Sequence, residues 1–210
     1  MLNDIAEVFN NLDKLKFTQY TDPCNISIVD NFLPNTILYN CNLEIQNESI
    51  WDDSFVRVPR DYTTRIEYKT LDKTPVIELV INYFNGAKFV KWLENNFKYN
   101  GLITDPALEA GGVCKIPAGK TLTVHKDSNW NDRIKCNHVI NACLYLQAGP
   151  NLEIGNQSFE IKPNRLICWE DPHLIPHGFR ETLTEDRINI VIFYYVSNTQ
   201  EPREIYGSYD

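Results

Sequence analysis

The sequence predicts an α+β, mainly β protein in which helices pack outside an antiparallel barrel or jelly roll. From Gly111 onward, short apolar or alternating runs are separated by Gly, Pro and Asn, with no helical stretch between them. Such runs are typical of antiparallel barrels and jelly rolls. Before Gly111, apolar residues recur at helical spacing. Because no repeat or linker divides the 210 residues, we expect a single domain over 1–210, with supporting helices and a hairpin in 1–110 and the β core in 111–198.

The N-terminal segment is predicted to form a helix, a strand and a second helix. A short amphipathic helix is indicated by apolar residues at helical spacing: Ile5, Val8, Phe9 and Leu12. Residues 25–45 begin as an alternating apolar run, reach Asp30 and Asn31, and continue with helical periodicity. This order predicts a strand, a turn and a helix.

Residues 54–68 are predicted to form a β-hairpin. Apolar or aromatic side chains alternate there with Arg and Thr, and Pro59 and Asp61 interrupt the pattern. We therefore expect two short strands joined by an irregular tip. Such a hairpin often borders a pocket.

Two helices are predicted between the hairpin and the β core. Thr74 and Pro75 favour a helix start, because Thr can cap and Pro has the backbone angle of the first helical position. Asn85 and Gly86 end this helix, and a second one follows. Their apolar faces are formed by Val76, Ile77, Val80, Ile81 and Phe84 in the first, and by Phe89, Trp92, Leu93 and Phe97 in the second.

The C-terminal half is predicted to supply the strands of the barrel. Each run is short, rich in apolar or β-branched residues, and bounded by turn residues. The runs cover residues 119–127, 138–147, 151–155, 157–163, 164–171 and 187–197.

Composition and charge argue against several classes of function. The net charge of −8 is unfavourable for broad binding to nucleic acid or anionic membranes. The first residues contain charges and no long apolar run, so we expect neither a signal peptide nor a membrane span, and a cytoplasmic location. The six cysteines form no C-x-x-C pair, which argues against a zinc site of the usual spacing and favours reduced thiols.

His125 and Asp127 are candidate metal ligands. They are two residues apart in an alternating run, so in a strand both side chains would point to the same face. Two histidines and one carboxylate on one side of a metal, with the other positions open, are typical of non-haem iron(II) oxygenases. The H-x-D pattern alone also fits a solvated strand end. The segment after residue 170 offers His173 and His177 as candidates for the second histidine.

Three stretches together resemble the iron and 2-oxoglutarate-dependent dioxygenases, in particular the prolyl 4-hydroxylase-like branch. These stretches are GGVCKIPAGKTLTVHKDSNW, LYLQ and HGFRETLTEDRINIVIFYY. The family pattern runs Gly-x-x-Leu-x-x-His-x-Asp, then a Tyr-Leu-Asn strand, then a distal His followed about ten residues later by Arg or Lys. The matching positions are Gly119, Leu122, His125, Asp127, Tyr145, His177 and Arg187.

The resemblance implies a double-stranded β-helix, which is a jelly-roll or cupin-like core, and a role for each matching residue. His125, Asp127 and His177 would hold Fe(II), because Arg187 follows His177 by the family interval. His173 is then expected to be a solvated loop residue. O2 and 2-oxoglutarate would be co-substrates, with ascorbate as an optional reductant.

Arg187 would bind the far carboxylate of 2-oxoglutarate with two parallel hydrogen bonds. Its alternative role is an ion pair with Asp186 or Glu185 at the strand entrance. Tyr145 would contact the same carboxylate, or belong to the apolar core. Asn141 and Asn189 are polar residues in apolar strands, and either could line the co-substrate pocket.

Two departures from the family pattern limit what can be transferred. Residues 146–153 form a shorter turn than the Trp and Gly-Gly segment of many members, so the substrate-side loop differs. Lys115 occupies a position near which the family commonly has Tyr or Gln. The metal motif is intact. Because halogenating relatives replace the carboxylate with a small residue, Asp127 favours hydroxylation.

The resemblance makes a peptidyl proline the first candidate substrate, and a free small metabolite the alternative. Trp130 and the hairpin residues Arg57, Arg60 and Arg65 could form walls of a peptide site, or be ordinary surface and edge-strand residues. A non-catalytic jelly-roll binding module and a zinc hydrolase are further alternatives. The first predicts a damaged triad, and the second has no use for Arg187. The sequence does not indicate an oligomeric state.

Overall fold

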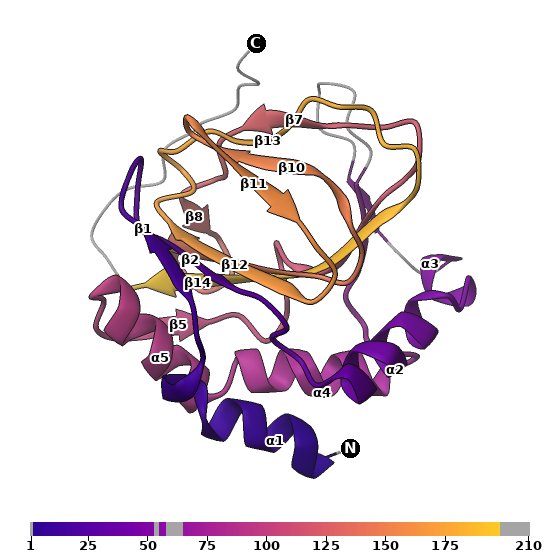
Figure 1. The fold of residues 1–210 in the computed structure, drawn as a ribbon. Coiled ribbons are helices and arrows are strands. Elements are labelled where there is room, and N and C mark those ends of the chain that lie inside the picture. The colour runs from indigo at the N-terminus through magenta and orange to yellow at the C-terminus, as the bar shows by residue number, and fades with distance from the viewer. Residues whose placement is uncertain (1, 53–54, 58–64, 198–210) are drawn as a thin grey trace.

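Two β-sheets face each other, and a layer of helices covers the outer side of the larger one (Figure 1). The computed structural model describes residues 2–52, 55–57 and 65–197. In spatial order the large sheet contains β1 (Thr18–Tyr20), β2 (Ile26–Val29), β12 (Arg165–Glu170), β9 (Cys136–Tyr145), β14 (Arg187–Val196), β6 (Gly112–Ile116), β4 (Arg65–Tyr68) and β3 (Phe55–Arg57). In addition, β5 (Leu102–Thr104) pairs with β14, and β8 (Trp130–Asn131) pairs with β9.

The small sheet shows how the chain winds between the two layers. In spatial order it contains β11 (Gln157–Ile161), β10 (Gly149–Ile154), β13 (His177–Phe179) and β7 (Leu122–His125). From β6 onward the chain passes to β7, returns to β9, passes to β10 and β11, returns to β12, passes to β13 and returns to β14. With its antiparallel pairings, this path is a double-stranded β-helix, which confirms the predicted fold class.

The helices bury the outer face of the large sheet. They are α1 (Leu2–Asn10), α2 (Asn35–Ile45), α4 (Pro75–Phe84) and α5 (Ala87–Phe97), with the short α3 (Ser49–Asp52) and the 3₁₀ turn η1 (Leu12–Lys14). Their apolar faces share one core with the even-numbered residues of β14, from Ile188 to Tyr194. The Tyr194 hydroxyl donates to the carbonyl of Phe84 at 2.9 Å. Among the described residues, no helix is long and apolar enough to cross a membrane.

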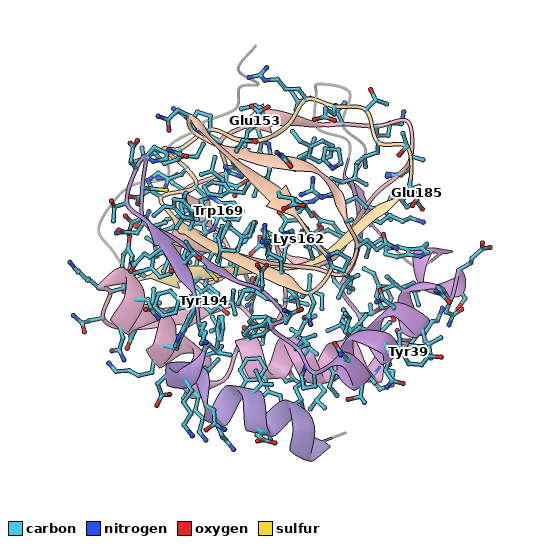
Figure 2. The ribbon with its side chains drawn as sticks, viewed as in Figure 1. Tyr39, Glu153, Lys162, Trp169, Glu185 and Tyr194 are labelled. Atoms are coloured by element: carbon cyan, nitrogen blue, oxygen red, sulfur yellow. The ribbon has the colours of Figure 1, made fainter. Side chains whose placement is uncertain are left out.

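The odd-numbered residues of β14 face the space between the sheets. Val191, Phe193 and Tyr195 pack there in a second core with Tyr145 and Trp169. Figure 2 shows the two sides, with Tyr194 toward the helices and Trp169 between the sheets. The alternation predicted for this strand is therefore present. The six cysteines are free and buried.

The start of α4 differs from the prediction in its cap. Thr74 occupies the N-cap position, but its buried hydroxyl contacts the carbonyl of Leu71 at 3.3 Å and caps nothing. The carboxylate of Glu44, from α2, instead accepts hydrogen bonds from the backbone N–H groups of Val76 and Ile77 at 2.8 and 2.9 Å. An anionic acceptor at a helix N-terminus also complements the helix dipole. A tertiary contact therefore replaces the predicted local cap.

The hairpin prediction is confirmed where the structure describes it. β3 and β4 pair antiparallel, with Arg57 opposite Arg65. The predicted tip, including Pro59, Arg60 and Asp61, lies outside the described residues. β4 also pairs with β6, which belongs to the β-helix. The hairpin therefore adds two strands to the edge of the large sheet.

Candidate metal centre

Two histidines lie side by side on neighbouring strands of the small sheet. His125 is the last residue of β7, His177 is the first residue of β13, and the two are direct partners in the antiparallel pairing. Gly178 permits this approach, because a Cβ atom at its position would lie 2.5 Å from the carbonyl oxygen of Leu122. The two imidazole centroids are 4.7 Å apart. Strand pairing thus brings together two residues that are distant in the sequence.

Each imidazole is oriented by its Nδ1 atom. Nδ1 of His125 lies 2.8 Å from the carbonyl oxygen of Thr123, and Nδ1 of His177 lies 3.0 Å from that of Ile175. Because a carbonyl oxygen only accepts, each Nδ1 carries the hydrogen and each Nε2 presents a lone pair. Both rings therefore offer Nε2 as a ligand atom.

Asp127 lies between the two Nε2 atoms. Its Oδ1 is 3.4 Å from Nε2 of His125, and its Oδ2 is 3.4 Å from Nε2 of His177. One ligand atom from each of the three residues lies within 4.8 Å of the others. The same-face prediction for His125 and Asp127 needs one correction, because β7 ends at His125. Asp127 follows the strand and is held by its backbone N–H, which donates to the carbonyl of Pro172 at 3.1 Å.

The electrostatics of the three residues suit a divalent cation. Burial opposes ionisation of Asp127, but His177 and His125 outweigh it and hold the pKa of Asp127 well below its usual range. Burial would lower the pKa of His177, but the Asp127 carboxylate outweighs it and raises that pKa. A bound metal cation would replace the proton that the Asp127 carboxylate favours on the imidazole of His177. Two imidazole nitrogens and one carboxylate fit Fe(II), which binds such mixed nitrogen and oxygen sets.

A pocket of about 470 Å³, including its open mouth, adjoins the three residues, and Arg187 lies in its wall. Arg187 is only 2% exposed, and its Nη1 has no hydrogen-bond partner among the described residues. Its guanidinium carbon lies 4.8 Å from the ring centroid of Tyr145 and 4.5 Å from that of Phe179. A buried cation without an anion is costly, so this group fits an anionic ligand such as a carboxylate.

The alternative ion pair for Arg187 is not seen within the described residues. Asp186 instead accepts a hydrogen bond from the backbone N–H of Ala118 at 2.9 Å and lies 3.5 Å from Nζ of Lys115. Nζ of Lys115 also lies 4.5 Å from the ring centroid of Trp51, outside the pocket lining. Among the described residues, Nη1 of Arg187 is therefore left available to a ligand.

The other predicted co-substrate residues also line the pocket. Tyr145 and Asn189 are direct partners across β9 and β14, and both are buried. Burial raises the pKa of Tyr145, so its hydroxyl stays protonated and can donate. Asn141 lines the pocket too, but its Nδ2 donates to Oδ2 of Asp127 at 2.8 Å. Asn141 thus contacts a predicted metal ligand, which the sequence did not indicate.

His173 differs from the sequence prediction. It was expected to be solvated, but it is buried, with 9% of its surface exposed, in the segment that follows β12. It is not part of the group formed by His125, Asp127 and His177. The chain folds this segment back on itself, because the N–H groups of Leu174 and Ile175 donate to the carbonyl of Asp171. Its exclusion from the metal group agrees with the choice of His177.

The predicted wall residues have different positions. Arg65 lines the pocket, where its Nε donates to the buried carboxylate of Glu67 at 2.7 Å. Trp130 is not in the lining, and its indole N–H contacts Asp132 at 3.2 Å. The Arg57 side chain and Arg60 lie outside what the structure describes.

Trp169 is a pocket residue that the sequence reasoning missed. Its ring packs edge-on against His177, with centroids 5.1 Å apart. An aromatic residue in an apolar strand carries no local signal that separates a site from a core. Asn141 did carry a signal, because it is polar within an apolar strand.

Comparisons by sequence and by structure give different results. No protein-family model matches the sequence, and no curated protein matches it either. Solved structures do resemble it. A prolyl hydroxylase from Trichoplax adhaerens, in complex with a hypoxia inducible factor peptide fragment, superposes with a TM-score of 0.59 and 16% identity over 92% of this chain and 90% of that one.

Two further structures are similar. The viral collagen prolyl hydroxylase of Paramecium Bursaria Chlorella virus-1, in its 2-oxoglutarate complex, gives a TM-score of 0.56 and 13% identity over 82% of this chain and 96% of that one. HygX from Streptomyces hygroscopicus, with nickel, 2-oxoglutarate and hygromycin B bound, gives a TM-score of 0.55 and 13% identity over 81% of this chain and 82% of that one. This chain therefore has the fold of the 2-oxoglutarate and Fe(II) oxygenases, including that of prolyl 4-hydroxylases.

Proposed function

We propose that this protein is a 2-oxoglutarate-dependent Fe(II) dioxygenase that hydroxylates its substrate. One observation carries the proposal. A pocket inside the β-helix contains His125, Asp127 and His177 as a compact ligand group, and in the same wall the buried Arg187, whose Nη1 has no hydrogen-bond partner among the described residues. A non-catalytic barrel has no need for either feature, and a zinc hydrolase has no need for Arg187.

In this proposal each residue has a distinct task. His125, Asp127 and His177 would hold Fe(II) through two imidazole nitrogens and one carboxylate. Fe(II), when bound with 2-oxoglutarate and O2, supplies the oxidation in which 2-oxoglutarate becomes succinate and CO2, one oxygen atom enters succinate and the other converts a substrate C–H to C–OH. Arg187 binds the far carboxylate of 2-oxoglutarate, and the Tyr145 hydroxyl donates to the same group.

The walls of the pocket support the same assignment. Leu152, Val191 and Phe193 line it beside the polar groups. Apolar walls exclude water, which strengthens the attraction between Arg187 and an anionic co-substrate. They also protect a reactive centre from side reactions.

Two substrate classes are compatible with this site. A peptidyl proline is the first candidate, supported by the similarity to prolyl hydroxylases and by the β3–β4 hairpin beside the pocket. A free small molecule is the second, because HygX has the same fold to a similar degree and was solved with hygromycin B. Arg65, which lines the pocket at the base of the hairpin, is a candidate contact for either class.

Succinate formation tests the proposed reaction. The purified protein is incubated with Fe(II), 2-oxoglutarate and ascorbate, with proline-containing peptides in one arm and free amino acids and other small metabolites in another. We expect succinate in the presence of a true substrate, and none with His125→Ala or Asp127→Ala. A protein that binds Fe(II) but makes no succinate in any arm would contradict the oxygenase assignment.

A further inference from the structure

We infer that Asn141 is a positioning residue that sets the orientation of the Asp127 carboxylate for the metal. This inference rests on the proposed function, because it assigns a task to Asn141 only if Asp127 is a metal ligand. It adds a second task to the expectation that Asn141 lines the co-substrate pocket.

The contact is specific in direction. Nδ2 of Asn141 donates to Oδ2 of Asp127 at 2.8 Å, and Asn141 is 2% exposed. Reversing the carboxamide would place its oxygen against a carboxylate oxygen, and two acceptors would then repel. Hydrogen bonds to charged acceptors are stronger than those between neutral groups. The donor side of Asn141 is therefore the side that faces Asp127.

The strand that carries Asn141 is held on both sides. β9 lies between β12 and β14, and Asn141 is the direct partner of Trp169 on one and Phe193 on the other. Direct partners in adjacent strands point to the same face, so two large aromatic side chains flank the carboxamide. Its position is fixed by packing before any ligand binds.

Asp127 is less well held by its own backbone. It lies beyond the end of β7, and its backbone N–H donates to the carbonyl of Pro172. Each carboxylate oxygen is 3.4 Å from one histidine Nε2, so the histidines alone do not favour one rotation of the carboxylate. Asn141 removes this ambiguity. It donates to Oδ2 and so distinguishes one carboxylate oxygen from the other.

The consequence is a preorganised ligand set. A carboxylate held in one rotation loses less freedom when a metal binds, and hydrogen bonds to metal ligands commonly change metal affinity by about 10- to 100-fold. The strand that carries Asn141 also carries Tyr145, so one rigid element supports the metal ligand and the co-substrate pocket.

Nickel binding to the full chain tests the inference without requiring turnover. Asn141→Leu keeps the shape between the two aromatic residues and removes the donor. We expect its Ni²⁺ affinity, measured by isothermal titration calorimetry, to be about 10- to 100-fold weaker than that of the unsubstituted protein. The absorption bands of the Co²⁺-loaded protein should also change, because the carboxylate loses a hydrogen bond.

Asn189→Leu is the matched control. Asn189 is buried on the inner face and lines the same pocket, but among the described contacts it has none with Asp127. Its substitution should leave Ni²⁺ affinity and the Co²⁺ spectrum unchanged. Thermal unfolding of the metal-free proteins checks that both variants fold, and Asn141→Ala replaces Asn141→Leu if the latter does not.

The outcomes separate this inference from the proposed function. Unchanged Ni²⁺ affinity and Co²⁺ spectrum in a folded Asn141 variant would overturn the positioning role. An equal loss of affinity in the Asn189 and Asn141 variants would also overturn it, because the effect would belong to the pocket in general. Failure of the unsubstituted protein to bind Ni²⁺ would instead contradict the metal centre itself.

Discussion

Arg187 combines full burial with a charge that has no counter-ion among the described residues. A group in this situation raises the free energy of the ligand-free protein, because burial removes water from the cation without providing an anion. The aromatic faces of Tyr145 and Phe179 compensate in part through cation–π contacts. The remaining cost is recovered when an anion binds.

Replacing Arg187 should therefore separate stability from binding. We predict that Arg187→Met leaves the free energy of unfolding of the ligand-free protein unchanged, or raises it by about 1 kcal/mol, while 2-oxoglutarate binding is lost. Chemical denaturation and calorimetric titration of the metal-loaded protein measure the two effects. Arg180→Met is the control, because Arg180 is exposed and, within the part of the chain that the structure describes, pairs with Glu153 alone. A large loss of stability with Arg187→Met would show that an ion pair supports this residue.

His173 and His125 offer a test of the ligand choice. His173 is buried but outside the ligand group, so we predict that His173→Gln lowers stability by about 1 kcal/mol and leaves Ni²⁺ affinity nearly unchanged. His125→Ala, by contrast, should abolish measurable Ni²⁺ binding while the protein stays folded. Calorimetric titration and thermal unfolding measure both. Loss of metal binding with His173→Gln and its retention with His177→Ala would reverse the assignment.

At the scale of elements, α2 and α4 are joined by a cap that neither helix could supply alone. Glu44 accepts hydrogen bonds from two N–H groups in the first turn of α4, which would otherwise lack partners within the helix. We predict that Glu44→Ala lowers the free energy of unfolding by about 1 kcal/mol. Urea denaturation measures this, with the exposed Glu48→Ala as control. Equal stability of the two variants would mean that the cap contributes nothing.

β2 and β12 are linked at one end by an ion pair. The guanidinium of Arg165 donates from Nε and Nη2 to the carboxylate of Asp30 at 2.5 and 2.7 Å, and these bonds lower the pKa of Asp30 below its ordinary value of 3.8. A depressed carboxylate pKa stabilises the folded state above the unfolded-state value and loses this contribution as the pH falls through the folded-state value. Because Asp30 is half exposed, solvent screening keeps the contribution small.

We therefore predict a pH-dependent effect of Asp30→Asn. At pH 7 the substitution should cost about 0.5 to 1 kcal/mol, and the difference from the unsubstituted protein should shrink as the pH is lowered below 4. Denaturation series at several pH values measure it. A difference that stays constant down to pH 2 would contradict the electrostatic origin.

At the scale of the whole molecule, the helices and the β-helix depend on each other. The outer face of the large sheet is apolar along β9, β12 and β14, and the helices of the first half bury it. We predict that a fragment of residues 111–198 shows no cooperative unfolding and aggregates, because this face would be exposed to water. Circular dichroism and size-exclusion chromatography measure both properties. A monomeric fragment that unfolds cooperatively would show that the β core is an independent unit.

The candidate metal centre is also a property of the whole fold. β7 and β13 supply the two candidate histidine ligands from the small sheet, and Asp127 follows β7. Asn141 and Arg187 line the same pocket from β9 and β14 of the large sheet. The pocket therefore forms only when the two sheets face each other. His125 and His177 are distant in the sequence, and they become neighbours because the chain passes repeatedly from one sheet to the other.

Local patterns in the sequence predicted much of this architecture. The alternation of β14 predicted its two faces, because side chains in a strand alternate with a period of two. The helical spacing before residue 111 predicted α1, α2, α4 and α5. Short strands leave a weaker pattern of alternation in the sequence. β13 was not predicted, because it has three residues and one of them is Gly178.

By itself, the periodicity of the sequence determined an antiparallel barrel or jelly roll with helices outside it, and the resemblance to the dioxygenases implied the double-stranded β-helix and named the three residues of the candidate ligand group. Only the tertiary structure decided that Glu44 caps α4, that His173 is buried, and that Asn141 binds Asp127. The physical reason is the range of each interaction. Periodicity and turn chemistry act between near neighbours and leave a pattern along the chain, whereas a contact between distant residues depends on how whole strands and helices pack.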